Sequence, residues 1–380
     1  MSTAPHSRAA LLGRRTPREF LTRFWHKQAL LVRAAVPGFA GLISRAALFA
    51  LAGRDDVEAR IVVRTGRSYT LEHGPFRRAD FRALPARNWT LLVQGVNLYS
   101  DAADALLRRF AFVPYARLDD LMISFAAPGG GVGPHFDSYD VFLLQGTGRR
   151  RWRYGRQRDL ALREGLPVKI LRRFDPTHDD VLCPGDMLYL PPAYAHDGVA
   201  VDACTTYSIG FRAASNTELA QQFLDHLRDR LELPGRYADP DLAPTATPAR
   251  IGAAMRRHAV RALAGIRWDR AVVARFLGTL LSEPKANVSF DAPDAPLSRA
   301  AFAGAARRRG VHLDRRSLLL YDDDALYFNG DAHPWPAGDR TALAALADAR
   351  ALTAAQVRPI GAGVLRFLHE GYVHGYLQPG

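Results

Sequence analysis

Two histidines and one aspartate in the middle of the chain are spaced as a metal site would require. His135 and Asp137 stand two residues apart where a strand is expected to begin, so both side chains should point to one face. His196 follows a Pro-Gly-Asp turn at 184–186 and the run MLYLPP, which predict a second strand ending at the same place. Two histidines and a carboxylate on neighbouring strand ends form the facial triad that binds Fe(II) and leaves three coordination positions open. Either histidine alone would more often be an ordinary packed or surface residue, but the combination predicts that His135, Asp137 and His196 are catalytic iron ligands.

Arg150 is placed to bind the cosubstrate that such an iron centre uses. The run RRRWRYG predicts a strand beside the ligand strand, with Arg150 and Trp152 on one face and Arg149 and Arg151 on the other. 2-Oxoglutarate chelates iron through its keto acid end, and a buried arginine can hold its distal carboxylate through two hydrogen bonds. Ser124, in the run LMISF, could donate its hydroxyl to the same ligand, although an ordinary strand hydroxyl is the simpler interpretation of this residue. The alternative for Arg150 is a surface ion pair.

The segments around these residues are expected to form an antiparallel barrel or sandwich. Between 121 and 212 the chain consists of short runs rich in β-branched and aromatic residues, separated by glycine and proline turns. Strands and helices do not alternate there, which argues against a parallel α/β sheet. Upstream, Thr16 and Glu19 predict a capping box at the start of a helix, and 60–72 predicts a hairpin. The polar segment at 178–180 is interpreted as a loop rather than as a second metal site.

Helical periodicity replaces the strand pattern after residue 217. Three segments within 217–283 have apolar residues at a spacing near 3.6, which predicts three amphipathic helices. Residues 296–380 predict a helix, a hairpin and two short helices, a pattern compatible with a winged helix. We therefore expect three regions: a β-rich catalytic domain with an N-terminal elaboration at 1–215, a helical segment at 216–290, and a winged-helix-like domain at 291–380.

The composition is that of a large folded protein with a basic first part. A length of 380 residues predicts two or three domains, and only two cysteines exclude a disulfide framework or a cysteine-rich zinc module. Neither a membrane span nor a secretory signal is expected, which favours the cytoplasm. The net charge is +13, and residues 148–173 carry ten cations against Asp159 and Glu164. Such a strip favours a polyanionic environment such as RNA or a ribosome, and a solvated arginine-rich face is an equal alternative.

The chain resembles the JmjC-type ribosomal oxygenases over three stretches: LMISFAAPGGGVGPHFDSYDVFLLQGTGRRRWRYG, PGDMLYLPPAYAHDG and YSIGFRA. It is similar in particular to their bacterial branch, the arginine 3-hydroxylases of large-subunit ribosomal protein L sixteen. The resemblance implies a double-stranded β-helix (cupin) core of JmjC type, a helical dimerisation segment and a C-terminal winged helix. It also implies that His135, Asp137 and His196 bind iron. Arg150, where human relatives carry lysine, would bind the distal carboxylate of 2-oxoglutarate, with Ser124 as a further contact.

The activity that this resemblance implies is Fe(II)- and 2-oxoglutarate-dependent hydroxylation of an arginine in a large-subunit ribosomal protein, with succinate and CO₂ as products. The amphipathic helices and the resemblance together predict a homodimer. The residues alone leave N-methyl demethylation open, because it uses the same triad and cosubstrate. An arginine substrate also needs a carboxylate or aromatic partner near the mouth of the site. Tyr139 and Asp140 lie nearby in the sequence, but the pattern does not show which way their side chains point, so no role is assigned to them.

A nucleic-acid-binding winged helix with a ligand-sensing cupin is the remaining alternative. The tail argues against it, because residues 286–380 carry ten arginines and ten acids. The expected wing also contains Asp322, Asp323 and Asp324, which would repel phosphate. Direct nucleic-acid binding is therefore not expected.

Overall fold

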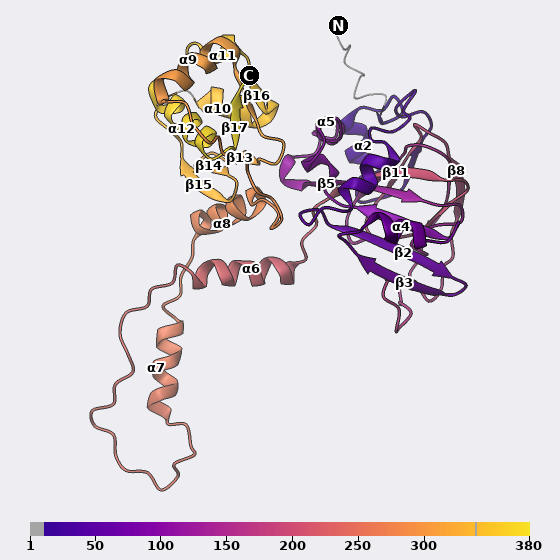
Figure 1. Ribbon diagram of the computed structural model, residues 1–380. Coiled ribbons are helices and arrows are strands. Elements are labelled where there is room, and N and C mark those ends of the chain that lie inside the picture. Colours follow the sequence, from indigo (N-terminus) through magenta and orange to yellow (C-terminus); the bar gives the residue numbers. More distant parts are fainter. Residues whose placement is uncertain (1–10, 339) are drawn as a thin grey trace.

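The computed structural model describes residues 11–338 and 340–380. It contains a β-rich body, a stretch of three helices and a C-terminal α/β part (Figure 1). Helix α7 (Ala253–Leu263) and the long loop before it project away from both folded parts. Among the described residues, no helix is both long and apolar enough to cross a membrane.

Two antiparallel sheets form the β-rich body. One has eight strands in the order β1-β9-β6-β11-β5-β4-β2-β3, and the other has three in the order β10-β7-β8. The strands are β1 (Leu30–Val32), β2 (Ala59–Thr65), β3 (Ser68–His73), β4 (Trp89–Val93), β5 (Leu118–Ala126), β6 (Val141–Gln145), β7 (Arg150–Arg156), β8 (His178–Leu182), β9 (Met187–Leu190), β10 (Tyr194–Ala200) and β11 (Cys204–Phe211). From β6 onward the chain passes back and forth between the two sheets. This arrangement confirms the double-stranded β-helix core.

Apolar side chains alternate between the two faces of the large sheet. Along β6, Phe142 and Leu144 belong to the core beneath the N-terminal helices, whereas Val141 and Leu143 face the small sheet. The helices on the outer face are α2 (Pro17–Arg23), α3 (Arg45–Leu51), α4 (Arg78–Ala83) and α5 (Asp101–Arg108). Helix α2 begins with the predicted capping box of Thr16 and Glu19. The inner face is left free to line a cavity.

One segment that was expected to be a loop is a strand. Residues 178–180 begin β8, which pairs with β7 at the edge of the small sheet. Asp179 accepts hydrogen bonds of 2.7 and 2.5 Å from Arg151, and Asp180 accepts one of 3.0 Å from the Tyr154 hydroxyl. The acidic side chains of this segment therefore pair with polar and cationic side chains of β7. The loop prediction was wrong because β7 is distant in the sequence and its side chains could not be taken into account.

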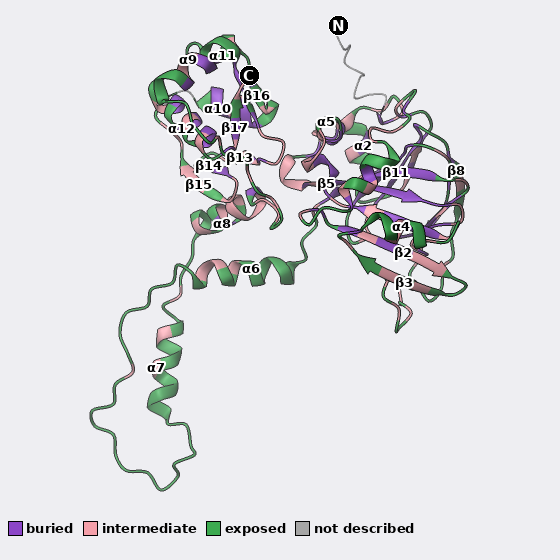
Figure 2. Cartoon of the chain, viewed as in Figure 1, coloured by how far each residue is buried: buried purple, intermediate pink, exposed green. Residues whose placement is uncertain are grey.

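The three predicted helices follow β11. They are α6 (Asn216–Arg228), α7 and α8 (Arg270–Ser282). Helices α6 and α7 bury no residue and are green and pink in Figure 2, without purple, whereas α8 buries Phe276 and Ser282. Helix α8 packs against the sheet that contains β14 (Ala325–Phe328), so it belongs structurally to the C-terminal part.

The C-terminal part has more elements than the sequence pattern predicted. Its helices are α9 (Arg299–Arg309), α10 (Arg340–Ala349), α11 (Ala354–Val357) and α12 (Ala362–Val373). Its remaining strands are β12 (Val311–Leu313), β13 (Leu319–Tyr321), β15 (Asp331–Pro334), β16 (Ala351–Leu352) and β17 (Leu377–Pro379). Three helices, rather than two, follow the expected hairpin, and two three-stranded sheets frame them. The extra strands have only two to four residues, too few for a periodic signal.

Asp186 ties the turn before β9 to the end of β1, and its replacement should destabilise the body. Its carboxylate accepts hydrogen bonds from the backbone N–H of Ala34 (2.9 Å) and Cys183 (3.0 Å) and from Arg33 (2.8 Å). We expect Asp186→Ala to lower the free energy of unfolding by about 1–3 kcal/mol, because it removes a buried carboxylate and leaves two part-buried backbone N–H groups without their acceptor. Asp175→Ala, which removes only a surface pair, should change it by less than about 1 kcal/mol.

The pH dependence of this contribution has a definite sign. Burial raises the pKa of Asp186, but the two backbone donors and Arg33 outweigh it and lower the pKa below its usual value. The contribution is therefore present above the unfolded-state pKa of about 4 and is lost as the pH falls through the folded-state pKa. Urea unfolding at neutral and acidic pH measures it. An Asp186→Ala protein as stable as the parent at neutral pH would contradict the assignment.

Candidate active site

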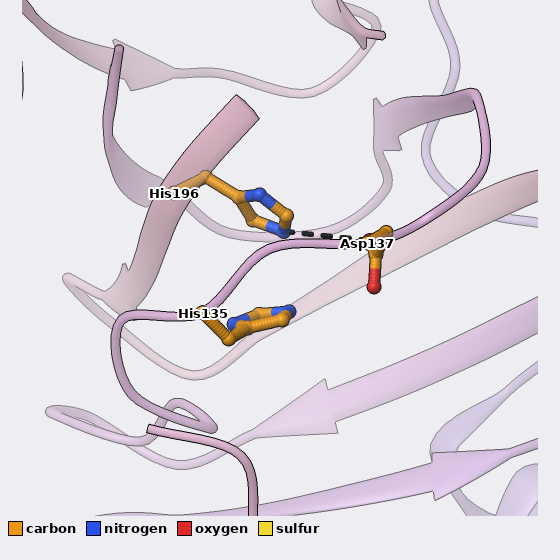
Figure 3. Close-up of side chains that lie close together, drawn as sticks. All are labelled: His135, Asp137 and His196. Carbon is orange, nitrogen blue, oxygen red and sulfur yellow. Dashed lines mark ion pairs between the residues drawn. The ribbon is translucent and has the colours of Figure 1, made fainter. Parts of the chain in front are cut away.

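His135, Asp137 and His196 converge inside the β-rich body (Figure 3). One potential ligand atom from each lies within 4.8 Å of the other two, and within the described part of the chain this is the one such group of three or more metal-binding side chains. The Nε2 atom of His196 lies 3.6 Å from Oδ2 of Asp137, and the two imidazole rings are 4.2 Å apart between centroids. The predicted triad residues are therefore brought together in space.

Backbone carbonyl groups orient both imidazole rings. Nδ1 of His135 donates to the carbonyl oxygen of Gly133 (2.8 Å), and Nδ1 of His196 donates to that of Tyr194 (2.9 Å). A carbonyl oxygen can only accept, so each Nδ1 carries the proton and each Nε2 offers a lone pair. Burial, with His135 as a further cause, lowers the pKa of His196 to about 4. His196 is therefore neutral at neutral pH, the form in which imidazole binds a metal.

Two details of the predicted placement were wrong. His135 and Asp137 precede β6, which begins at Val141, and His135 forms an isolated bridge with His196 through backbone hydrogen bonds of 2.9 and 2.8 Å. His196 lies on β10 in the small sheet rather than at the end of the strand that contains MLYLPP. The two prolines at 191–192 lack N–H groups and end β9, and Ala193 turns the chain with a φ of 61°. The turn thus moves the chain to the other sheet before His196.

Arg150 is buried on the strand beside the one that carries His196. Strand β7 pairs with β10, and Arg150 is 5% exposed. Nη1 of Arg150 donates to Oγ of Ser124 (3.3 Å), and the guanidinium lies 5.6 Å from the centroid of the Trp152 ring. Nε and Nη2 of Arg150 are buried and have no hydrogen-bond partner. Buried cationic donors are normally satisfied, so these two atoms fit the carboxylate of a bound ligand.

A cavity of about 550 Å³ connects these groups. Its wall includes the three triad residues, Arg150, Ser124 and Trp152. The donor set fits an octahedral metal with three open positions, and the arginine fits the far end of a dicarboxylate. The cavity can therefore hold iron and 2-oxoglutarate together, with space left beside them.

The wall also contains residues that the sequence analysis did not identify. Asp119 and Asp120, near the start of β5, line the cavity together with Tyr139. The adjacent acids in the run LDDLMISF, on the strand of Ser124, were the available signal. Asp140 has a different place: it is fully buried, accepts a hydrogen bond from Tyr189 and lies 3.0 Å from His26. Of the two unassigned candidates, Tyr139 alone lines the site.

Comparison with known proteins identifies both folded parts of the chain. Residues 105–219 match the JmjC domain family, and residues 265–378 match the ROXA-like winged helix family. The chain is 37% identical over 341 residues to the ribosomal protein uL16 3-hydroxylase of Escherichia coli K12, covering 88% of this chain and 90% of that protein. It is 38% identical over 232 residues to a probable ribosomal oxygenase of Haemophilus influenzae, covering 60% and 55%.

Solved structures give the same result. The X-ray structure of E. coli YcfD matches with a TM-score of 0.81 at 33% identity, covering 95% of this chain and 97% of that one. YcfD, described as a ribosomal oxygenase in complex with cobalt and 2-oxoglutarate, matches with a TM-score of 0.79 at 33% identity and the same coverage. These matches confirm the JmjC core and the winged helix. The chain belongs to the JmjC-type ribosomal oxygenase family, in its bacterial branch.

Proposed function

We propose that this chain is an Fe(II)- and 2-oxoglutarate-dependent oxygenase that hydroxylates an arginine side chain of the large-subunit ribosomal protein uL16 (L sixteen). The observation that carries the proposal is the presence, in one cavity, of a His-Asp-His triad and a buried arginine with two unpartnered nitrogen atoms. The uL16 3-hydroxylase of E. coli, with which the chain aligns over most of its length, supports the choice of substrate.

Each residue of the site has a distinct part in this proposal. His135, Asp137 and His196 hold the iron, and Arg150 binds the distal carboxylate of 2-oxoglutarate through Nε and Nη2. The bound iron, with 2-oxoglutarate and O₂, supplies the oxidising power to hydroxylate a C–H bond, and succinate and CO₂ are the other products. Ser124 holds the guanidinium of Arg150 in place, because its Oγ accepts from Nη1.

The charge distribution of the cavity supports an arginine substrate. Asp120, Met122 and Ser124 alternate along β5 and line the same cavity. Four residues of a strand span about 13 Å, so β5 carries an acidic group at one end and the cosubstrate contact at the other. A guanidinium group beside Asp119 and Asp120 would leave the arginine methylenes directed toward the metal ligands. The test is mass spectrometry of uL16 after turnover, which should show one added oxygen atom on a single arginine.

We further propose that the chain works as a homodimer in the cytoplasm. Its three regions would be the catalytic domain at 1–215, a dimerisation segment at 216–290, whose last helix α8 packs on the C-terminal part, and the winged-helix-like domain at 291–380. The support is that α7 exposes large apolar side chains, among them Met255 (49%) and Leu263 (64%), which lie on one helix face. A second copy of the chain would cover this face.

The dimer can be tested by sedimentation at micromolar concentration. We expect the parent protein to sediment as a dimer and the double variant Met255→Asp/Leu263→Asp to sediment as a monomer, because two charges on the apolar face oppose its burial. Arg261→Asp, on the opposite face of α7, should remain dimeric. A monomeric parent protein would overturn the dimer proposal and leave the enzymatic one intact.

A further inference from the structure

One cation from the C-terminal half of the chain contacts the acidic end of the active-site cavity. Lys285 follows α8 by three residues and lies outside the 105–219 JmjC match. Its Nζ atom is 3.2 Å from Oδ1 of Asp119 and 3.5 Å from Oδ2 of Asp120. These two aspartates are the ones that line the cavity near Tyr139. A charge from the second half of the protein therefore lies directly behind the acidic pair.

The two aspartates form a wall between two spaces. They line the active-site cavity on one side and, on the other, a smaller cleft between the β-rich body and the C-terminal part. The smaller cleft is lined by cations that are not part of the active-site wall, among them Arg212, Lys285 and Arg315. Lys285 thus acts on any substrate only through the carboxylates.

The contacts divide the carboxylate oxygens into two sets. Oδ1 of Asp119 faces Lys285 and, at 3.7 Å, Arg212, while Oδ2 of Asp120 faces Lys285 and accepts from the backbone N–H of Gly95 (2.8 Å). Among the described residues, no hydrogen bond or ion pair engages Asp119 Oδ2 or Asp120 Oδ1. Oδ1 of Asp120 lies on the side of Gly210, which lines the active-site cavity. One oxygen of each residue is therefore left for a cation in the cavity.

The electrostatic balance also depends on Lys285. Burial raises the pKa of Asp120, and Lys285 is the main group that opposes this rise. Burial lowers the pKa of Lys285, but Asp120 and Asp119 outweigh it and raise the pKa overall. Two adjacent carboxylates, one of them buried, repel each other, and a nearby cation offsets this repulsion. Lys285 supplies that cation without occupying the cavity.

Lys285 is not needed to hold the two halves of the protein together. Other contacts join them: Arg315 to Asp101 (2.5 Å), Tyr115 to the carbonyl of Asp348 (3.0 Å), Arg212 to the carbonyl of Leu281 (2.8 Å) and Asn287 to the carbonyl of Asp56 (2.7 Å). A purely structural tie would also not require contact with both acids that line the active site.

We infer that Lys285 is a positioning residue for substrate binding: it holds Asp119 and Asp120 so that their free oxygens bind the guanidinium group of the substrate arginine. This inference rests on the proposed arginine hydroxylase function and deepens it. The C-terminal half of the chain then contributes to substrate affinity without contacting the metal or 2-oxoglutarate. Displacement of this half from the body would weaken substrate binding and leave the cosubstrate site unchanged.

The test compares full-length Lys285→Met with the parent protein. With Fe(II), 2-oxoglutarate and a uL16 peptide that contains the target arginine, we expect the KM for the peptide to rise about tenfold. The KM for 2-oxoglutarate should stay unchanged, as should the slow succinate formation without peptide. Lys285→Arg should restore most of the peptide affinity, because it returns the charge. Arg315→Met, which removes a cation from the same cleft without touching either acid, should leave the peptide KM unchanged.

Three kinds of result would overturn the inference. The first is a peptide KM for Lys285→Met equal to that of the parent. The second is an equal effect on the KM for 2-oxoglutarate, or a failure of Lys285→Arg to restore affinity, either of which would indicate general damage to the fold. The third is an equal rise in Arg315→Met. Fluorescence anisotropy of the peptide separates this inference from the proposed function: a parent protein that neither binds nor oxidises the peptide rejects the substrate class, and the inference falls with it.

Discussion

Alanine in place of His135 or Asp137 should abolish arginine hydroxylation, lowering the rate more than about 1,000-fold. Each residue would supply one of only three protein ligands to the metal, and the remaining pair would not hold Fe(II) at the concentrations used for assay. The lost stabilisation of the reacting groups amounts to several kcal/mol, and each 1.36 kcal/mol corresponds to a tenfold change in rate. Single-turnover assays with excess Fe(II) measure the loss.

Metal binding gives a second readout of the same variants. Calorimetric titration with Mn(II) or Co(II) should show a weaker site in both variants and an unchanged one in His178→Ala. His178 is an exposed histidine of the small sheet that stacks on Tyr154, so it controls for the loss of an imidazole. Full activity in His135→Ala, with unchanged metal affinity, would remove the triad from the mechanism.

Replacement of Arg150 by methionine should raise the KM for 2-oxoglutarate about 100-fold. The variant keeps a long apolar side chain next to Trp152 but removes the two donors, Nε and Nη2, that have no other partner. A bidentate, charge-assisted pair in a buried site contributes about 3 kcal/mol, which corresponds to roughly two powers of ten. Iron affinity should remain, because Arg150 does not belong to the metal-binding group.

The neighbouring residues provide graded controls for Arg150. Arg151→Met should leave the KM for 2-oxoglutarate unchanged, because Arg151 faces outward and pairs with Asp179. Arg150→Lys should be intermediate, since lysine supplies the charge without the fork of donors. Ser124→Ala should raise the KM only a few-fold, because it removes one hydrogen bond to Arg150 while the guanidinium keeps its contact with the Trp152 ring. An Arg150→Met protein with normal 2-oxoglutarate affinity would show that the cosubstrate binds elsewhere.

Local patterns in the sequence were sufficient to predict most of the core. The segments around Ser124 and Val141 are short runs rich in β-branched, aromatic and other apolar residues, and nearly all of their residues are buried because both faces of the large sheet are covered there. The parity argument for Arg150 held because β7 is a regular strand, with Arg151 exposed and Trp152 buried. The capping box of Thr16 and Glu19 depends only on residues three apart, so it needed no tertiary information.

The errors concern features that depend on distant partners. His135 and Asp137 lie outside a regular strand because the backbone of His135 pairs with His196, which is far away in the sequence. The acids of β8 look like loop residues until the arginines of β7 lie beside them. The pairing of Lys285 with Asp119 joins two halves of the chain, and no local pattern around either residue indicates it.

The most direct test of the central claim is the mass of uL16 after reaction with this protein. The protein is reconstituted anaerobically with Fe(II) and then given 2-oxoglutarate, O₂ and recombinant uL16. The account predicts the gain of one oxygen atom, about 16 Da, on a single arginine identified by fragmentation, and no gain without 2-oxoglutarate. Succinate without modified uL16 would keep the oxygenase chemistry and reject the substrate, and loss of an N-methyl group would indicate demethylation. The absence of both succinate and a mass change would contradict the account as a whole.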